Sequence, residues 1–240
     1  MAAILEVEGV SRNFSGLRAV ADVSFTVPEG AIFAVIGPNG AGKTTMFNLI
    51  AGLFAPNGGT ITFQGQRIEG LTPDEVCRRG IGRTFQIVRP FPALTVEDNV
   101  MVGALLRHGD PRQAMQRAHD VLRRLDLYDK RLQLGGSLTL PDRKRLEVAR
   151  ALATEPKLLL LDEVMAGLRP TETDRIVDIL KELNAGGLTI LLIEHVMRAV
   201  MSLATRVLVL HHGAAIAEGT PAEVVRDPAV VQSYLGAEAL

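Results

Sequence analysis

Two short segments of the sequence carry residues suited to phosphate chemistry. The first, GPNGAGKTT, fits the pattern G-x-x-x-x-G-K-[ST]. Its residues are Gly37, Pro38, Asn39, Gly40, Ala41, Gly42, Lys43, Thr44 and Thr45. Glycines let backbone N–H groups curl around phosphates, the Lys43 ammonium can reach the β- and γ-phosphates, and the Thr44 hydroxyl can bind Mg²⁺. The segment therefore predicts a nucleotide phosphate site.

The second segment, LLLLDE, is an apolar run that ends in two adjacent acids. Asp162 would lie at the carboxyl edge of a sheet, where open α/β folds bind ligands, and could hold Mg²⁺. Glu163 could act as a general base on an attacking water. Together with the phosphate segment, this pair favours hydrolysis of the nucleotide over transfer to a second substrate.

Three single residues are further candidates by position. Gln86 closes the segment IGRTFQ and could reach Mg²⁺ and water, although such a residue is also common in loops. His195, which is expected to start a helix after the run LTILLIE, could donate a hydrogen bond to the γ-phosphate or be structural. Phe14 could stack on a purine base or pack in the core.

The segment LTLPDRKRLEVARALA predicts a helix with a distinctive start. Thr139 and Asp142 have the spacing of a capping box. A helix N-terminus attracts phosphate through its unpaired N–H groups. Pro141 removes one of these groups and Asp142 adds a negative charge. From the residues alone, a phosphate site, a weakened one and an ordinary helix start all remain open.

Alternating strand and helix patterns surround these segments. Residues 4–10 and 21–27 alternate in polarity, as half-buried strands do, while residues 31–37 and 157–163 form apolar runs typical of buried strands. A largely helical block covers residues 96–153. Strands and helices then alternate to the end of the chain, which predicts an α/β fold with a mainly parallel sheet covered on both faces.

Composition excludes several classes of protein. The 240 residues are 47% hydrophobic, which predicts a globular core, and the net charge of −1 gives no indication of nucleic-acid binding. Cys77 is the single cysteine, so an internal disulfide is excluded. The first residues do not resemble a signal peptide, and no uncharged apolar run approaches the ~20 residues of a membrane span.

In this order, the motifs resemble those of the ATP-binding subunits of ABC transporters. GPNGAGKTT looks like their Walker A motif, Gln86 their Q-loop, LLLLDE their Walker B, AGLRP their D-loop and His195 their switch histidine. Phe14 falls where the family has an adenine-stacking aromatic residue. The resemblance implies ATP and Mg²⁺ as cofactors, with Thr44, Gln86 and Asp162 at the metal and Glu163, Gln86 and His195 in catalysis.

The resemblance also implies a domain organisation. We expect residues 1–240 to form a single ABC ATP-binding domain with a RecA-like P-loop NTPase core. The core would comprise residues 1–85 and 154–240, with a mainly parallel sheet and an antiparallel β portion. Residues 86–153 would form an inserted α-helical subdomain that meets the membrane partner.

Several longer segments are similar to those in the ATP-binding subunits of the high-affinity branched-chain amino acid importers. RTFQIVRPFPALTVEDNV, DEVMAGLRPTET, IEHVMRAVM and DPAVVQSYLG carry this similarity. Related urea and amide importers have similar sequences, so they remain an alternative. The implied partners are transmembrane permease subunits, docked near residues 86–106, and indirectly a solute-binding protein. The implied location is peripheral, on the cytoplasmic face of the membrane.

The segment LTLPD occupies the position of the family's LSGGQ signature. In the family, two subunits pair head to tail, and each signature caps the γ-phosphate held by the other subunit. Here the signature residues are Leu138, Thr139, Leu140, Pro141 and Asp142. The replacement of the two glycines predicts that the start of this helix binds phosphate weakly. It also predicts a heterodimer with one ATP site that hydrolyses ATP normally and one that is slow. A nucleotide-binding partner with little turnover is the alternative to a fully active ATPase subunit.

Overall fold

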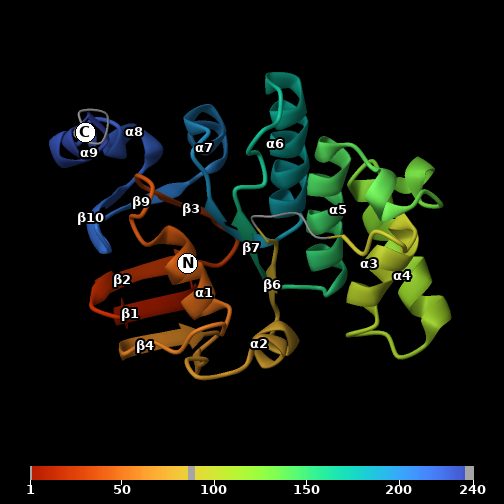
Figure 1. The fold of residues 1–240 in the computed structure, drawn as a ribbon, viewed down its shortest axis with the longest axis horizontal. Helices are drawn as coiled ribbons and strands as arrows, with labels where there is room; N and C mark the ends of the chain where they lie inside the picture. Colours follow the sequence, from red (N-terminus) through yellow and green to blue (C-terminus); the bar gives the residue numbers. More distant parts are fainter. Residues whose placement is uncertain (1, 86–89, 236–240) are drawn as a thin grey trace. The chain divides into compact units, whose positions relative to one another are not determined.

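The computed structural model describes residues 2–85 and 90–235 (Figure 1). Its internal contacts divide the chain into two compact units. The first unit comprises Met1–Val76 and Thr189–Leu240, and the second comprises Cys77–Leu188. The sequence-based division into a core (residues 1–85 and 154–240) and a helical subdomain (residues 86–153) stays a prediction.

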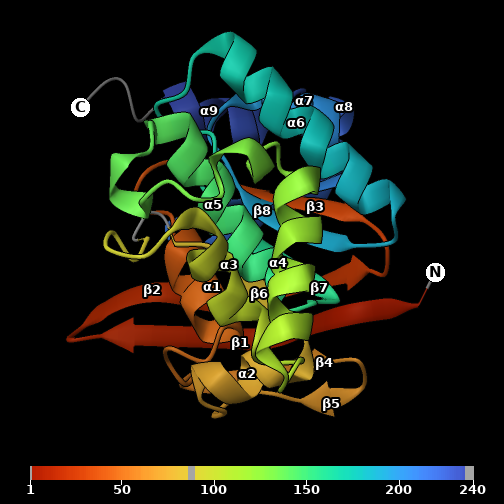
Figure 2. The same ribbon diagram turned by 90° about the vertical axis from the view of Figure 1, so that its right-hand side faces the viewer.

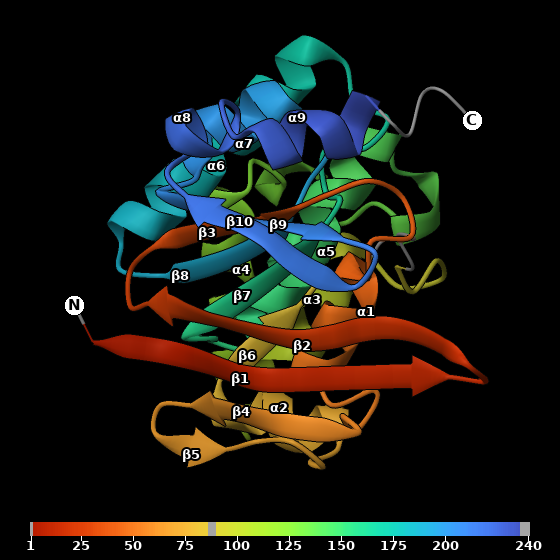
Figure 3. The same ribbon diagram turned by 90° about the vertical axis from the view of Figure 1, so that its left-hand side faces the viewer.

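An antiparallel sheet forms one part of the first unit (Figure 3). Its strands are β1 (Ala3–Phe14), β2 (Leu17–Pro28), β4 (Gly58–Phe63) and β5 (Gln66–Arg67), in the order β2-β1-β4-β5. Val7 pairs with Phe25 across β1 and β2, and both side chains are buried. The polarity alternation of these segments therefore has its expected cause, because one face of each strand covers the core.

A second group of strands in the first unit is mainly parallel. It comprises β3 (Ile32–Ile36), β8 (Thr189–Ile193), β9 (Arg206–His211) and β10 (Ala214–Gly219). β3 pairs in parallel with both β8 and β9, and β10 pairs antiparallel with β9. Every residue of β3 and β8 is buried, as expected for strands covered on both faces. The carboxyl ends of β3 and β8 consequently meet at one edge.

Short helices complete the first unit. They are α1 (Lys43–Ile50), α7 (Met197–Leu203), α8 (Pro221–Val224) and α9 (Pro228–Leu235). α2 (Pro73–Arg79) spans the boundary between the units. A capping box, in which the Glu223 carboxylate accepts from the Thr220 N–H at 2.7 Å, fixes the start of α8. The expected alternation of helices with strands towards the end of the chain agrees with α7 and α8, whereas α9 was not expected.

The second unit contains a parallel strand pair and a group of helices (Figure 2). β6 (Ile81–Arg83) pairs with β7 (Leu158–Asp162). The helices are α3 (Val96–Ala104), α4 (Pro111–Arg124), α5 (Leu140–Ala153) and α6 (Pro170–Ala185). The side chains of Val100 on α3, Ala118 on α4 and Leu146 on α5 are fully buried. The predicted helical block is therefore present, and the α/β class with parallel and antiparallel strands is confirmed.

Within the described ranges, no helix combines sufficient length with sufficient apolar character to cross a bilayer.

Candidate nucleotide-binding site

The phosphate loop emerges from the carboxyl end of β3 and leads into α1. The Lys43 side chain is buried, and its Nζ donates hydrogen bonds to the main-chain oxygens of Gly37 at 2.7 Å and Pro38 at 2.8 Å. The loop therefore curls around the ammonium group. Thr44 and Thr45 follow in the first turn of α1, where helix N–H groups favour an anion.

Two glycines of the loop are required by close backbone packing. A Cβ at Gly37 would lie 2.1 Å from the Leu210 carbonyl oxygen, and a Cβ at Gly42 would lie 2.3 Å from the Ala19 carbonyl oxygen. Both residues also have positive φ, 149° and 99°. The fold around the loop thus excludes side chains at these positions.

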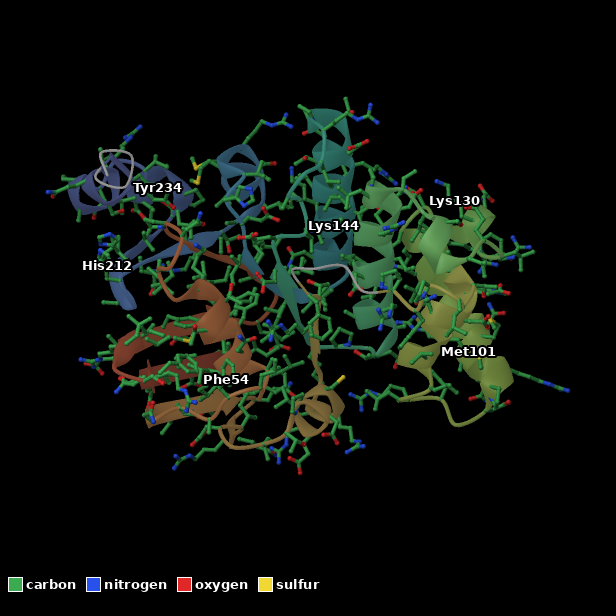
Figure 4. All side chains as sticks on the ribbon, in the orientation of Figure 1. Phe54, Met101, Lys130, Lys144, His212 and Tyr234 are labelled. Atoms are coloured by element: carbon green, nitrogen blue, oxygen red, sulfur yellow. The ribbon has the colours of Figure 1, made fainter. Side chains whose placement is uncertain are left out.

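A cavity of about 530 Å³ adjoins the loop, a size typical of ligand pockets. Its lining combines Pro38–Ala41 with the β9–β10 turn, at His211 and His212, and with residues of α9. Figure 4 labels His212 and Tyr234 in this part of the first unit. Burial raises the pKa of Tyr234, and a hydrogen bond with the Gly37 backbone opposes part of that rise. Neither the β9–β10 turn nor α9 was expected at this site from the sequence, although two adjacent histidines, His211 and His212, were a local signal.

Phe14 lies at the end of β1 with its ring partly exposed. The Phe54 ring meets it edge to face, with centroids 5.3 Å apart, and the Arg12 guanidinium lies 4.8 Å from its centroid. These contacts hold the ring while leaving part of it accessible. Its predicted role in stacking on adenine stays a prediction.

His195 lies in the loop after β8 and is exposed. The expectation that it starts a helix is wrong, because α7 begins only at Met197. β8 and β3 are parallel neighbours, with Ile193 beside Val35. His195 therefore follows the same sheet edge from which the phosphate loop emerges, as its predicted role requires.

The first acid of the predicted pair ends β7 in the second unit. Asp162 is fully buried, and its N–H donates to the Thr84 hydroxyl oxygen at 3.2 Å. Arg83 approaches its carboxylate at 3.5 Å. Burial lowers the pKa of Arg83, and the Asp162 charge opposes this shift. A carboxylate such as that of Asp162 is an oxygen donor of the kind that Mg²⁺ prefers, so this residue fits the ion.

The second acid, Glu163, has a main-chain conformation that is uncommon for a residue with a side chain. Its φ is 50°, in the left-handed region. Lys144 Nζ donates to the Glu163 carbonyl oxygen at 2.8 Å, and the Lys144 side chain is buried (Figure 4). Lys144 was not expected at this site, because a lysine within a helical sequence pattern is usually exposed.

The predicted residue Gln86 lies outside the described residues. The chain that precedes it runs along β7, since the Thr84 N–H donates to the Leu160 carbonyl oxygen at 2.9 Å. Its predicted roles at Mg²⁺ and water stay predictions.

The signature segment forms the start of α5. Leu138 is buried, Thr139 and Leu140 are exposed, and Pro141 occupies the first turn. The Asp142 residue is only 2% exposed. The expected capping box is wrong, because the Thr139 hydroxyl donates to the Asp142 carboxylate at 2.8 Å and forms no cap with a backbone N–H.

Two cations also hold the Asp142 carboxylate. Lys130 Nζ and Arg145 Nη2 each approach it at 2.5 Å. Burial would raise the pKa of Asp142, but hydrogen bonds from Lys130, Thr139 and Arg145 together lower it. The negative charge expected at this helix tip is thus matched by neighbouring positive charges.

Two protein-family models match the sequence of this chain. A family model described as "ABC transporter" matches residues 20–166. A second model, described as "Branched-chain amino acid ATP-binding cassette transporter", matches residues 216–239, which include α9.

Individual proteins resemble the chain over nearly its whole length. The high-affinity branched-chain amino acid transport ATP-binding protein LivG of Salmonella typhimurium is 41% identical, over 97% of this chain and 98% of LivG. BraF of Pseudomonas aeruginosa, which has the same description, is 39% identical over the same shares. A crystal structure of the ADP conformation of an ABC transporter cassette has a TM-score of 0.90 and 32% identity. It covers 98% of this chain and 100% of that chain.

Proposed function

The chain belongs to the ABC transporter family of ATP-binding subunits, and on this premise we propose that it energises a membrane importer of branched-chain amino acids. As a member of that family it binds and hydrolyses ATP. The observation that carries the proposal is the complete phosphate loop, curled around Lys43, in a chain whose relatives are named as ATP-binding proteins of such importers.

Each chemical task of ATP binding and hydrolysis has a candidate residue in this chain. Lys43 and the N–H groups of Gly40–Thr45 would bind the phosphates, and His195 would donate to the γ-phosphate. Glu163 would take a proton from the attacking water. Thr44, Asp162 and Gln86 would hold Mg²⁺, which supplies neutralisation of the phosphate charge. Phe14 would stack on adenine.

Steady-state ATP hydrolysis tests this assignment. The chain is combined with its paired ATP subunit and permease, and the parent is compared with Glu163→Gln. Loss of the general base is expected to lower the rate of this chain's site by about 10²–10⁴ while ATP binding persists. Equal rates in parent and variant would favour the alternative of a nucleotide-binding subunit with little turnover.

A surface of the second unit supports docking of a permease. Phe85, Phe91, Val102 and Leu105 are exposed apolar residues around the start of the helical block. A cavity of about 170 Å³ lies beside them, lined by Phe85, Val102 and Arg150 among others. Apolar side chains beside a cavity favour insertion of a short helix. We propose that a cytoplasmic segment of the permease docks here, which would place the chain on the cytoplasmic face.

The cargo is tested by uptake in cells. Deletion of this chain's gene is expected to abolish high-affinity uptake of labelled leucine, and the gene for the Lys43→Ala variant is expected not to restore it. Unchanged leucine uptake combined with lost urea or amide uptake would replace the branched-chain assignment with the alternative cargo.

We further propose a head-to-tail heterodimer with unequal sites. The phosphate loop and Walker B acids of this chain are complete, whereas Leu140 and Pro141 replace the glycines of the signature. ATP bound by this chain would contact the partner's signature. ATP bound by the partner would contact the signature of this chain, which lacks the glycines. Replacing the Walker B glutamate of each subunit in turn tests this. Equal losses of ATPase activity would reject the asymmetry.

A further inference from the structure

The start of α5 contains a hydrogen bond whose direction is fixed by chemistry. The Thr139 Oγ1 and Asp142 Oδ2 atoms are 2.8 Å apart. A hydroxyl has one proton to donate, and an ionised carboxylate only accepts. The lowered pKa of Asp142 keeps this carboxylate ionised at neutral pH. The proton of Thr139 is therefore directed towards Asp142 and away from solvent.

The carboxylate that receives this proton is itself fixed in place. Oδ2 also accepts from Lys130, which comes from the 3₁₀ turn Tyr128–Lys130, and Oδ1 accepts from Arg145, one turn further along α5. Arg145 lies 3.7 Å from Asp126, which also pairs with Arg175 of α6 at 2.6 Å. Asp142 thus links α5 to the 3₁₀ turn, and the network continues to α6 through Arg145 and Asp126. Asp142 cannot turn outward without losing two charge-assisted hydrogen bonds.

The exposed atoms at this helix start are correspondingly poor partners for a phosphate. Thr139 is exposed, but with its proton committed it presents only lone pairs. Pro141 has no N–H, and Leu140 adds an exposed apolar side chain. Lone pairs and a phosphate oxygen are both electron-rich, so they repel each other.

We propose that Asp142 is a positioning residue that holds the Thr139 hydroxyl as an internal donor and thereby keeps the signature of this chain from donating to a partner's nucleotide. This inference rests on the proposed function, because it assumes the head-to-tail dimer. In this proposal the signature is weak because of the direction of the hydrogen bond between Thr139 and Asp142. The negative charge of Asp142 is not the cause.

An isosteric substitution reverses that direction. In Asp142→Asn, the side-chain nitrogen can take the place of Oδ2 and donate to Thr139 Oγ1, while the side-chain oxygen accepts from Arg145 at the place of Oδ1. Lys130 then loses its acceptor, and the Thr139 proton becomes available. The experiment uses the full chain in a Glu163→Gln background, in which bound ATP is retained. The dissociation constant of the ATP-dependent homodimer is measured by sedimentation with Mg²⁺ and ATP.

The expected result is that Asp142→Asn strengthens the ATP-dependent homodimer at least tenfold, and that the gain disappears in Thr139→Val/Asp142→Asn. Asp142→Gln, whose amide also donates, is the second variant in case the first does not fold. A role of Asp142 in stability alone would weaken the dimer or leave it unchanged in each variant. That outcome, or an equal gain in the Thr139→Val background, overturns the proposal.

ATP binding to each variant is measured separately by fluorescence of a labelled nucleotide. Binding in the parent and in Asp142→Asn with the same affinity shows that any change in dimerisation arises at the signature. Failure of the parent to bind ATP would contradict the proposed function, which separates the two failures.

Discussion

At the scale of single residues, the least expected contact joins Lys144 to the main chain of Glu163. The buried ammonium donates to the carbonyl oxygen of a residue with positive φ, a conformation that surrounding contacts must stabilise. Lys144→Met removes this donor. We expect kcat to fall about ten- to a hundredfold, because a hydrogen bond from a charged donor contributes about 1.5–3 kcal/mol.

The affinity for ATP and recovery by a conservative substitution distinguish this role from simple destabilisation. Lys144→Met is expected to leave the ATP dissociation constant unchanged, and Lys144→Arg is expected to restore part of kcat. If Lys144→Met lowered ATP affinity and kcat together, or if arginine gave no recovery, Lys144 would not position Glu163.

Residue types predicted the phosphate loop and the acid pair, but not how Asp142 and Lys144 are used. The residues of the phosphate loop are contiguous, so the spacing of its glycines and Lys43 in the sequence is enough to predict its conformation. Lys130 lies twelve residues before Asp142, and Glu163 lies nineteen residues after Lys144. Such partners meet only through packing of the second unit, and no local pattern in the sequence predicts them.

At the scale of elements, the phosphate loop depends on close approach of neighbouring backbone. Gly42→Ala would bring a Cβ to 2.3 Å from the Ala19 oxygen, whereas Gly30→Ala meets nothing within 4 Å at a similar φ of 74°. We expect Gly30→Ala to cost about 1 kcal/mol of unfolding free energy through backbone strain, and Gly42→Ala to cost at least twice as much. Equal losses in urea unfolding would contradict this packing.

The anchored start of α5 predicts a pH dependence. The pKa of Asp142 is lowered from its ordinary 3.8, so its contribution to stability is present above that pH and is lost as pH falls through the folded-state pKa. Asp142→Asn is expected to lower the unfolding free energy by about 2 kcal/mol at pH 7. The difference should shrink below about pH 4. A pH-independent difference would show that the carboxylate charge is not involved.

Most elements follow from sequence patterns, and the exceptions have a physical reason. Apolar runs such as Leu158–Leu161 and the glycines that end helices predict strands and helices well, because burial and local conformation act together. α9 was missed since its packing on the first unit is not visible as a periodic pattern. The start of α7 was placed too early because the apolar pattern does not mark where the loop after β8 ends.

At the scale of the whole molecule, the residues proposed for ATP binding and for catalysis are distributed over both units. The phosphate loop and His195 belong to the first unit, and Asp162 and Glu163 belong to the second. Lys43→Ala is therefore expected to abolish ATP binding, whereas Glu163→Gln is expected to abolish turnover and keep binding. Thermal unfolding with and without ATP checks this, because a ligand at 100 times its Kd stabilises by about 2.7 kcal/mol. A stabilised Lys43→Ala variant would contradict the assignment.

The central claim is that the loop from Gly37 to Thr45 binds the triphosphate of ATP. Isothermal titration of the full chain with ATP in the presence of Mg²⁺ tests it most directly. The account predicts saturable binding with one nucleotide per chain for the parent, and none for Lys43→Ala with unchanged circular dichroism. Absence of binding in the parent, or equal binding in both proteins, would contradict it.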